Sequence, residues 1–369
     1  MNPFFIGNKE IKLPIIQGGM GIAVSLSGLA SAVANEGGVG VISCAGLGLV
    51  YPKTPKNYLK DCIWGLREEI RKTREKTNGI IGVNIMVALS NFSDMVHTSI
   101  SEKIDIIFSG AGLPLDLPSY LTPKSQTALV PIVSSSRAAQ VICNKWHKNY
   151  SYLPDALVVE GPKAGGHLGF KKEQIEDENY SLERLIPDVV AVANQYKAQK
   201  NIPVIAAGGI YTGADIYRFM KLGAAAVQLG SIFVTTKECD ASDAFKQVYI
   251  HSSKKDIVII DSPVGMPGRA INSEFIQKIN SGSERPRTCP FHCIRTCNCT
   301  QSPYCIIKVL YNAAKGNMEK GYVFAGANAY LAKKINTVKE VFESMKSEYT
   351  IAKQSLERQL GNIKKYDSL

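Results

Sequence analysis

The segment 156–170, which reads A-L-V-V-E-G-P-K-A-G-G-H-L-G-F, combines residue types that could do chemistry together. An apolar run ends at Glu160, and the glycine pair Gly165 and Gly166 comes directly before His167. Adjacent glycines let a backbone approach a flat or phosphorylated ligand where any Cβ would collide. A histidine beside that ligand can act as a general base near neutral pH. The alternative is a turn whose glycines only reverse the chain and whose histidine lies at the surface.

Eight short apolar runs alternate with amphipathic stretches and predict the elements that position this segment. The runs are unbroken, as in parallel strands that are buried on both faces. Eight strand–helix units closing near residue 235 predict a (β/α)8 TIM barrel, with an open doubly wound sheet as the alternative. The predicted strands are 13–17, 39–44, 81–86, 104–109, 129–133, 156–160, 204–207 and 225–229, and the predicted helices are 25–36, 58–76, 93–102, 136–147, 181–197 and 214–222, with a short helical turn at 117–121.

Glycines follow most of these strands at the C-terminal end, where TIM barrels hold their active sites. Structural turns alone would place glycines at both ends of the strands, so the one-sided pattern indicates a ligand across the barrel mouth. Loops after the seventh and eighth strands commonly bind phosphate through backbone N–H groups. Gly208 and Gly209 after the seventh strand, with Gly230 and Ser231 after the eighth, predict such a phosphate cup.

Composition excludes several classes of protein. The 369 residues are 45% hydrophobic and 20% charged, which is typical of a globular protein. The net charge is +11, but the lysines are spread over helical stretches, so we expect no nucleic-acid partner. No apolar run approaches the roughly 18 residues needed to span a bilayer, and the first residues lack a secretion signal, so we expect a cytoplasmic protein that does not enter membranes.

The alternation changes after residue 235 and predicts three regions: a barrel (1–235), a cap and substrate region with a cysteine cluster (236–320), and C-terminal helices that pack on the barrel (321–369). Within the cap, we expect a helix at 241–251, a strand at 256–261, a Gly/Pro loop at 264–271, a polar segment at 280–288 and a helix at 307–315. A long amphipathic helix follows at 338–360.

Five of the nine cysteines fall within a stretch of seventeen residues in the cap. Such density in a reducing compartment indicates zinc or an iron–sulfur cluster, although the spacing fits neither a repeated C-x2-C pair nor the ferredoxin run. The alternative is a set of thiols that pack or pair locally. The candidate ligands are Cys289, Cys293, Cys297, Cys299 and Cys305.

Six motifs follow one another over residues 13 to about 272: P-I-I-Q-G-G-M-G, G-V-N-I, V-V-E-G-P-K-A-G-G-H-L-G, I-P-V-I-A-A-G-G-I, G-A-A-A-V-Q-L-G-S-I-F and G-M-P-G-R-A-I-N. In this order they resemble the flavin-dependent nitronate monooxygenase (2-nitropropane dioxygenase) family, which also contains flavin-type enoyl-acyl-carrier-protein reductases. The resemblance implies an FMN across the barrel mouth and makes His167 the catalytic histidine.

The resemblance also implies which residues hold the flavin. Gly19 and Met20 would approach the ring through their backbone, Asn84 and Glu160 would bond its polar edges or ribityl chain, and the pair Gly165 and Gly166 would permit close approach. The phosphate would be held by Gly208, Gly209, Gln228, Leu229, Gly230 and Ser231. The sequence departs from many monooxygenases in having Glu160 rather than glutamine, and from most members in having Ser231 rather than threonine.

Two functions follow from this resemblance, and the cysteines suggest a third. The first is an FMN-dependent nitronate monooxygenase that oxidises alkyl nitronates or nitroalkanes with O2 to a carbonyl compound and nitrite, with His167 as the base for neutral nitroalkanes. The alternative is an enoyl-thioester reductase that uses NAD(P)H and has an acyl carrier protein as partner. The third, suggested by the cysteines alone, is a flavin- or metal-binding regulator without turnover.

Arg269 would either face the flavin or an anionic substrate, or tether its loop.

Overall fold

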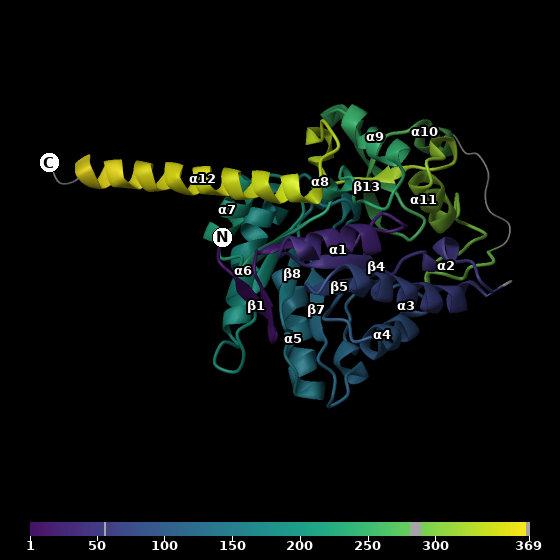
Figure 1. Cartoon of the computed structure of the whole chain (residues 1–369), viewed down its shortest axis with the longest axis horizontal. Helices are drawn as coiled ribbons and strands as arrows, with labels where there is room; N and C mark the ends of the chain where they lie inside the picture. The colour runs from purple at the N-terminus through teal and green to yellow at the C-terminus, as the bar shows by residue number, and fades with distance from the viewer. Residues whose placement is uncertain (55–56, 281–288, 367–369) are drawn as a thin grey trace.

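Eight parallel strands form the barrel in the computed structural model, which describes residues 1–54, 57–280 and 289–366 (Figure 1). The strands are hydrogen-bonded in the order β3-β11-β10-β8-β7-β6-β5-β4. A parallel bridge between Ile16 and Val39 joins β3 to β4 and completes the ring. The predicted TIM barrel is therefore confirmed, and the open sheet is excluded.

Each predicted strand and helix of the barrel is present, with ends shifted by a few residues. The strands are β3 (Ile15–Gln17), β4 (Gly40–Ser43), β5 (Ile81–Met86), β6 (Ile106–Gly110), β7 (Ala128–Val133), β8 (Leu157–Glu160), β10 (Val204–Ala207) and β11 (Ala226–Leu229). The helices are α1 (Ser27–Asn35), α2 (Leu47–Val50), α3 (Tyr58–Lys76), α4 (Phe92–Ser101), α5 (Ser136–Tyr150), α6 (Leu182–Asn194), α7 (Gly213–Lys221) and α8 (Ser231–Val234), and the predicted turn is the 3-10 helix at Leu117–Tyr120.

Burial explains why the strands read as unbroken apolar runs. Alternate side chains fill the barrel interior or pack under the surrounding helices, so both faces of each strand are covered. A hairpin of β1 (Phe4–Ile6) and β2 (Lys9–Ile11) adds Ile6 and Ile11 to the interior cluster. These two side chains are fully buried, so the hairpin closes the end of the barrel interior away from the mouth.

The cap contains a small sheet and three helices. These are α9 (Asp243–His251), β12 (Ile257–Asp261), β13 (Pro267–Ile271), α10 (Glu274–Asn280), α11 (Ile306–Ala314) and β14 (Val323–Phe324). The expected loop at 264–271 is wrong in its second half, because 267–271 is the central strand β13 and pairs with both β12 and β14. Its proline stands at the first position of the strand, where a missing N–H is tolerated. Most of the predicted polar segment at 280–288 lies outside the described residues.

The cap sheet is joined to the barrel by a two-residue strand. β9 (Gly166–His167), which belongs to the loop after β8, pairs antiparallel with β13. The barrel segment that carries the histidine is therefore an edge of the cap sheet, and the cap fixes its position.

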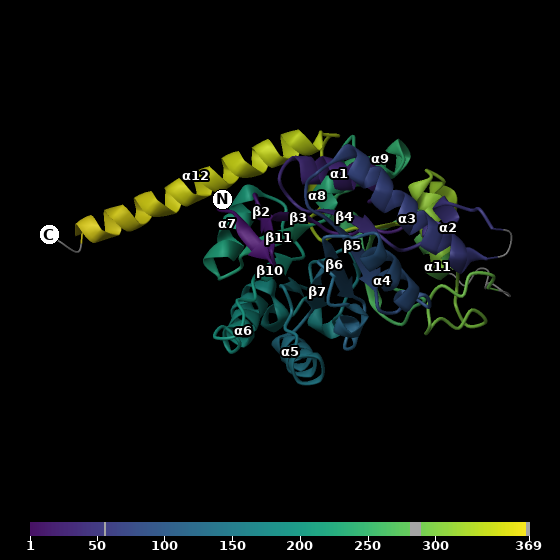
Figure 2. The same ribbon diagram turned by 60° about the horizontal axis from the view of Figure 1, so that its bottom comes forward.

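The last helix, α12 (Val338–Tyr366), packs on the barrel only along its first turns. Val338, Val341, Phe342 and Met345 are buried, and Tyr349 makes an edge-to-face contact with Tyr217. From there the helix runs past the barrel into open space (Figures 1 and 2). We infer that the C-terminal region docks on the barrel by one end.

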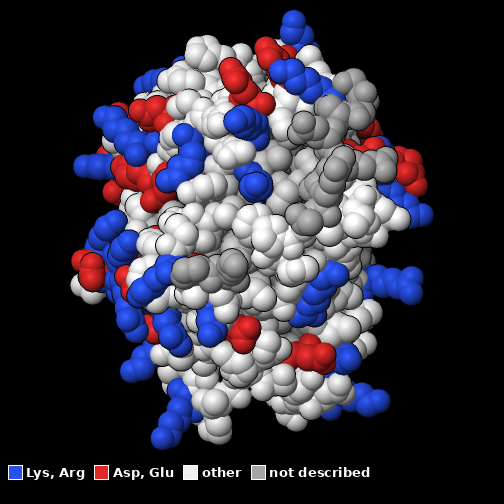
Figure 3. All heavy atoms as spheres, turned by 90° about the vertical axis from the view of Figure 1, so that its right-hand side faces the viewer, with Lys and Arg blue, Asp and Glu red and all other residues white. Residues whose placement is uncertain are grey.

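The surface carries charges of both signs. On the face shown in Figure 3, Lys and Arg side chains alternate with Asp and Glu rather than forming one continuous basic area. Among the described residues, no helix has the length and apolar character needed to cross a bilayer.

Candidate active site

A single cavity of about 820 Å³ opens at the C-terminal ends of the barrel strands. This volume is near the upper end of the range for ligand pockets, roughly 300–1,000 Å³. Every residue predicted to bind the cofactor or to act in catalysis lines it: Gly19, Met20, Asn84, Glu160, Gly165, Gly166, His167, Gly208, Gly209, Gln228, Leu229, Gly230 and Ser231. The fold thus brings together residues from loops that are more than 200 positions apart in the chain, as between Met20 and Gly230.

The predicted phosphate cup has free backbone donors. The N–H groups of Gly208, Gly209 and Gly230 meet no backbone acceptor in the described part of the chain. Gly208 and Gly209 have φ of +98° and +79°, conformations that favour glycine. The Ser231 hydroxyl accepts a hydrogen bond from Gly326 N at 3.1 Å, which leaves its proton available to a ligand. An anion with several acceptor oxygens fits this arrangement.

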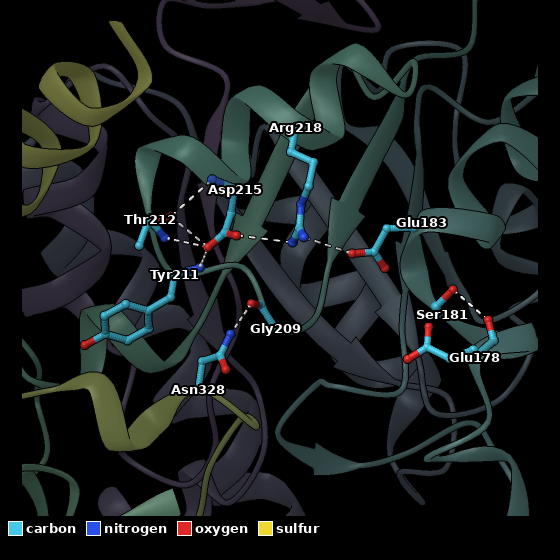
Figure 4. A network of polar contacts seen from close by, with 9 residues as sticks. All are labelled: Glu178, Ser181, Glu183, Gly209, Tyr211, Thr212, Asp215, Arg218 and Asn328. Carbon is cyan, nitrogen blue, oxygen red and sulfur yellow. Dashed lines mark hydrogen bonds and ion pairs between the residues drawn. The ribbon is translucent and has the colours of Figure 1, made fainter. Parts of the chain in front are cut away.

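The loop after β10 is held from both sides (Figure 4). Asn328, which follows β14, donates from Nδ2 to the carbonyl of Gly209 at 2.6 Å. Thr212 and Asp215 form a capping box at the start of α7, with Thr212 Oγ1 accepting from Asp215 N at 3.1 Å. The loop therefore presents its N–H groups from a fixed backbone.

Three polar side chains at strand ends have no hydrogen-bond partner among the described residues. These are Asn84 at β5, Glu160 at β8 and Gln228 at β11, and all three border the cavity. These side chains are half-buried in the cavity wall, so their polar groups are available to a ligand with polar edges. Burial raises the pKa of Glu160 to about 7, so its carboxyl can donate as well as accept a hydrogen bond near neutral pH.

His167 is fixed by three contacts. Its backbone pairs with Gly268 of β13, its ring meets Phe324 edge-to-face with centroids 5.0 Å apart, and its Nε2 lies 2.7 Å from Ser262 Oγ. Burial lowers the pKa of His167 to about 4, so the ring is neutral at physiological pH. Nδ1 has no partner in the described part of the chain, and it carries the free lone pair when Nε2–H donates to Ser262.

The two glycines before His167 have different roles. A Cβ on Gly165 would lie 2.6 Å from the backbone of Ala325 and Gly326, so this glycine allows the 325–326 segment to close over the loop. Gly166 has φ of +78°, and a Cβ there would meet nothing within 4 Å. Gly166 is therefore the position at which the backbone borders open cavity, while Gly165 serves packing.

Both backbone groups of Met20 form hydrogen bonds within its own loop. Its N–H donates to Ser25 Oγ at 2.8 Å, and its carbonyl accepts from Ser25 N at 3.0 Å. Because neither backbone group of Met20 is free, a contact between Met20 and a ligand in the cavity would be made through its side chain rather than through its backbone. The neighbouring Gly19 is required by packing, because a Cβ there would lie 2.2 Å from that of Asn84.

Arg269 does not line the cavity. Its side chain is buried and donates from Nη1 to the carbonyls of Pro162 and Ala164, the latter at 3.0 Å, while Nη2 lies 3.7 Å from Glu176. The alternative in which Arg269 faces the flavin or substrate is therefore wrong. The residue tethers the segment before His167 to the cap strand.

The cysteine cluster does not form a metal site in the described residues. Across 1–54, 57–280 and 289–366, no three His, Cys, Asp or Glu side chains gather in a way that could hold a metal ion, and the nine thiols are free. The metal expectation for the cluster therefore gains no support. One member, Cys293, is buried and lines the cavity.

Several residues at the cavity were not anticipated from the sequence. They come from the cap and the segment after β14: Phe324, Gly326 and Asn328 line the cavity, and Ser262 contacts His167 behind it. The A-G-A-N run at 325–328 resembles the glycine-containing turns of the barrel loops, and that composition is the one signal that could have indicated it. Ser262 had no comparable signal.

The chain is similar in sequence to known proteins. The nitronate monooxygenase family model matches residues 2–348. A probable nitronate monooxygenase of Staphylococcus saprophyticus is 26% identical over 74% of this chain and 79% of its own length. A (3aS,4S,5R,7aS)-5-hydroxy-7a-methyl-1-oxo-octahydro-1H-indene-4-carboxyl-CoA dehydrogenase of Mycobacterium tuberculosis is 28% identical over 74% of this chain and 67% of its own.

Among solved structures, FabK of Thermotoga maritima superimposes with a TM-score of 0.72 at 28% identity, covering 95% of this chain and 96% of the other. The family match extends over the barrel, the cap and the start of α12, so it includes every residue of the site described above. The chain belongs to the nitronate monooxygenase family of oxidoreductases.

Proposed function

We propose that this chain is an FMN-dependent nitronate monooxygenase that oxidises alkyl nitronates and nitroalkanes with O2 to a carbonyl compound and nitrite. The observation that carries the proposal is the shared cavity, in which a neutral His167 stands with free backbone donors and unpaired polar side chains. The family membership and the staphylococcal relative support the same reaction.

The residues present fit FMN. The free N–H groups of Gly208, Gly209 and Gly230, with the Ser231 hydroxyl, suit its phosphate. Asn84, Glu160 and Gln228 offer both donors and acceptors, which suits the polar edges of a flavin ring and its ribityl chain. When bound, the flavin supplies the electron acceptor, which no side chain can provide.

His167 takes a proton from the carbon next to the nitro group of a neutral nitroalkane. In the tautomer whose Nε2–H donates to Ser262 Oγ, the lone pair of Nδ1 is free to receive that proton. A pKa of about 4 keeps the ring unprotonated at neutral pH, at the expense of basicity. A preformed nitronate has already lost its proton and does not need this step.

The test compares His167→Ala with the wild type on both substrate forms. We expect oxidation of the neutral nitroalkane to fall by about 10²- to 10⁴-fold, oxidation of the nitronate to fall much less, and FMN to remain bound. The matched control is His147→Ala, which removes an exposed histidine from α5. Equal losses with both substrates, or loss of FMN, would count against the assignment of His167 as the base.

The second candidate is an NAD(P)H-dependent reductase of enoyl thioesters, with an acyl carrier protein as carrier of the substrate. It is favoured by Glu160, since many monooxygenases of the family have glutamine there, and by the mycobacterial relative, whose name specifies a CoA thioester. Anaerobic mixing separates the two functions by the loss of flavin absorbance. Reduction by a nitronate and not by NADH or NADPH supports the monooxygenase, and rapid reduction by either nicotinamide supports the reductase.

A further inference from the structure

The cavity has an end that the proposed chemistry does not use. Opposite the phosphate cup, its wall is apolar and is built largely by the cap, through α11 and the cysteine-rich segment before it. We call this part the apolar arm and define it by the lining residues Tyr58, Leu89, Cys293, Ile294, Ile306, Ile307 and Leu310.

The apolar arm is joined to the barrel by specific backbone contacts. Ser90 N donates to the carbonyl of Cys293 at 3.1 Å, and Arg295 N donates to that of Ala88 at 3.0 Å. Leu89 and Ile294 thus form an antiparallel bridge between the loop after β5 and the cysteine-rich segment. This arm lies over β5, whereas the phosphate cup lies over β10 and β11, on another part of the ring.

Side chains close the arm from the outside. Phe291 meets Tyr58 edge-to-face, with ring centroids 5.3 Å apart. The helix α11 begins after Cys305 and turns Ile306, Ile307 and Leu310 toward the cavity. Lys308 on the same helix is exposed, so α11 has one face toward the arm and one toward solvent.

The thiol in this wall behaves as an apolar side chain. Cys293 is only 6% exposed, and burial raises its pKa to about 12, so it stays uncharged at physiological pH. A neutral buried thiol packs like a small hydrophobic residue and is a poor nucleophile. Among the described residues, none of the side chains that define the arm carries a charge at neutral pH.

We infer that the apolar arm binds an extended, unbranched alkyl chain of the substrate and that α11 limits the length of that chain. The inference rests on the proposed function, because the reacting end of the same molecule would lie beside His167. It makes the physiological substrate a long-chain compound, since a nitronate of two or three carbons would leave the arm empty.

The experiment measures binding without turnover. Unbranched carboxylates from acetate to decanoate are planar anions with two oxygens, like a nitronate, but they cannot be oxidised at the same carbon. We expect isothermal titration calorimetry of the flavin-loaded protein to show affinity rising on the order of threefold per added methylene until the arm is filled.

Leu310→Trp should stop this rise at a shorter chain, and Lys308→Trp on the exposed face of α11 should leave it unchanged. Leu310→Ala serves as a second variant that fills no space: it should weaken decanoate binding by several-fold and leave acetate binding unaltered. Affinity that does not depend on chain length in the wild type, or equal behaviour of the Leu310 and Lys308 variants, would overturn the inference.

Failure of the proposed function gives a different result. If carboxylate binding depends on chain length but no nitronate is oxidised, the alkyl-binding role of the apolar arm is supported and the monooxygenase function is rejected. Oxidation of nitronates at equal efficiency from nitroethane to nitrooctane would support the monooxygenase and reject the arm.

Discussion

The two ends of the cavity are built by different means. The phosphate cup is made of backbone, with Gly208, Gly209 and Gly230 presenting N–H groups from short loops. The apolar arm is made of side chains, most of them from the cap, which is joined to the barrel there by a bridge between Leu89 and Ile294. A site made of backbone requires glycines, which can be recognised in the sequence. An apolar wall uses the same residue types as any hydrophobic core, so it cannot be recognised in this way.

Arg269 joins the loop after β8 to the cap strand β13, and its loss should have the largest effect on stability. Arg269→Met would leave the buried carbonyls of Pro162 and Ala164 without their donor, at an expected loss of about 2 to 4 kcal/mol in the free energy of unfolding. Urea denaturation measures this loss. The matched control is Lys172→Met, which breaks the exposed 2.7 Å ion pair with Asp261 and should lose less than about 1 kcal/mol. Equal losses would show that Arg269 is no tether.

Glu160 lies between the two ends, and its burial should make stability depend on pH. With its pKa raised to about 7, the folded protein keeps a proton that the unfolded chain releases above about pH 4.5. The stabilising contribution of Glu160 to the free energy of unfolding is therefore fully present below pH 4.5, and it is lost as the pH rises through about 7. Glu160→Gln should remove the loss and stabilise the flavin-free protein at pH 8 by about 1 to 3 kcal/mol.

The control for this prediction is Glu173→Gln, which replaces an exposed carboxyl a short distance further along the chain. Thermal unfolding between pH 5 and pH 8 compares the two variants. An unchanged pH dependence in Glu160→Gln would mean that the carboxylate is solvated by water in the cavity.

The smallest expected effect separates backbone strain from contact with the ligand. Gly166 and Gly265 have φ of +78° and +81°, and a Cβ at either position would meet nothing within 4 Å. Replacing each by alanine should lower the free energy of unfolding by about 1 kcal/mol, from strain alone. Only Gly166 borders the cavity, so only Gly166→Ala should also weaken FMN binding by several-fold in a calorimetric titration. Equal flavin affinity in both variants would place the cofactor away from Gly166.

The barrel could be predicted from the sequence because its signal is local and repeated. Apolar strands, amphipathic helices and glycines at one end recur with each unit, and all eight strands fall within the predicted ranges or a residue beyond them. The candidate site could be predicted for the same reason, since barrel topology gathers every C-terminal strand end at one mouth.

The cap could not be predicted to the same depth, because its contacts join segments that are distant in the chain. The pairing of β9 with β13 turned an expected loop into a strand, and nothing near Gly268 indicates its partner His167. Ser262 reaches His167 across 95 positions, and Arg269 binds carbonyl groups more than 100 positions away. The dense cysteines left a metal site and locally packed thiols open, and in the fold Cys293 supplies apolar surface to the cavity.

The position of β3 between β4 and β11 has a consequence for how the molecule is made. β3 can pair fully only after β11 has been synthesised, and the carboxylate of Asp240 binds the N–H of Leu26 across 214 residues. Loop closure of that length is entropically costly, so ring closure should be a late and slow event in folding. A nascent chain that still lacks β11 would expose one edge of β3 to other strands. We expect chaperones to bind such a chain.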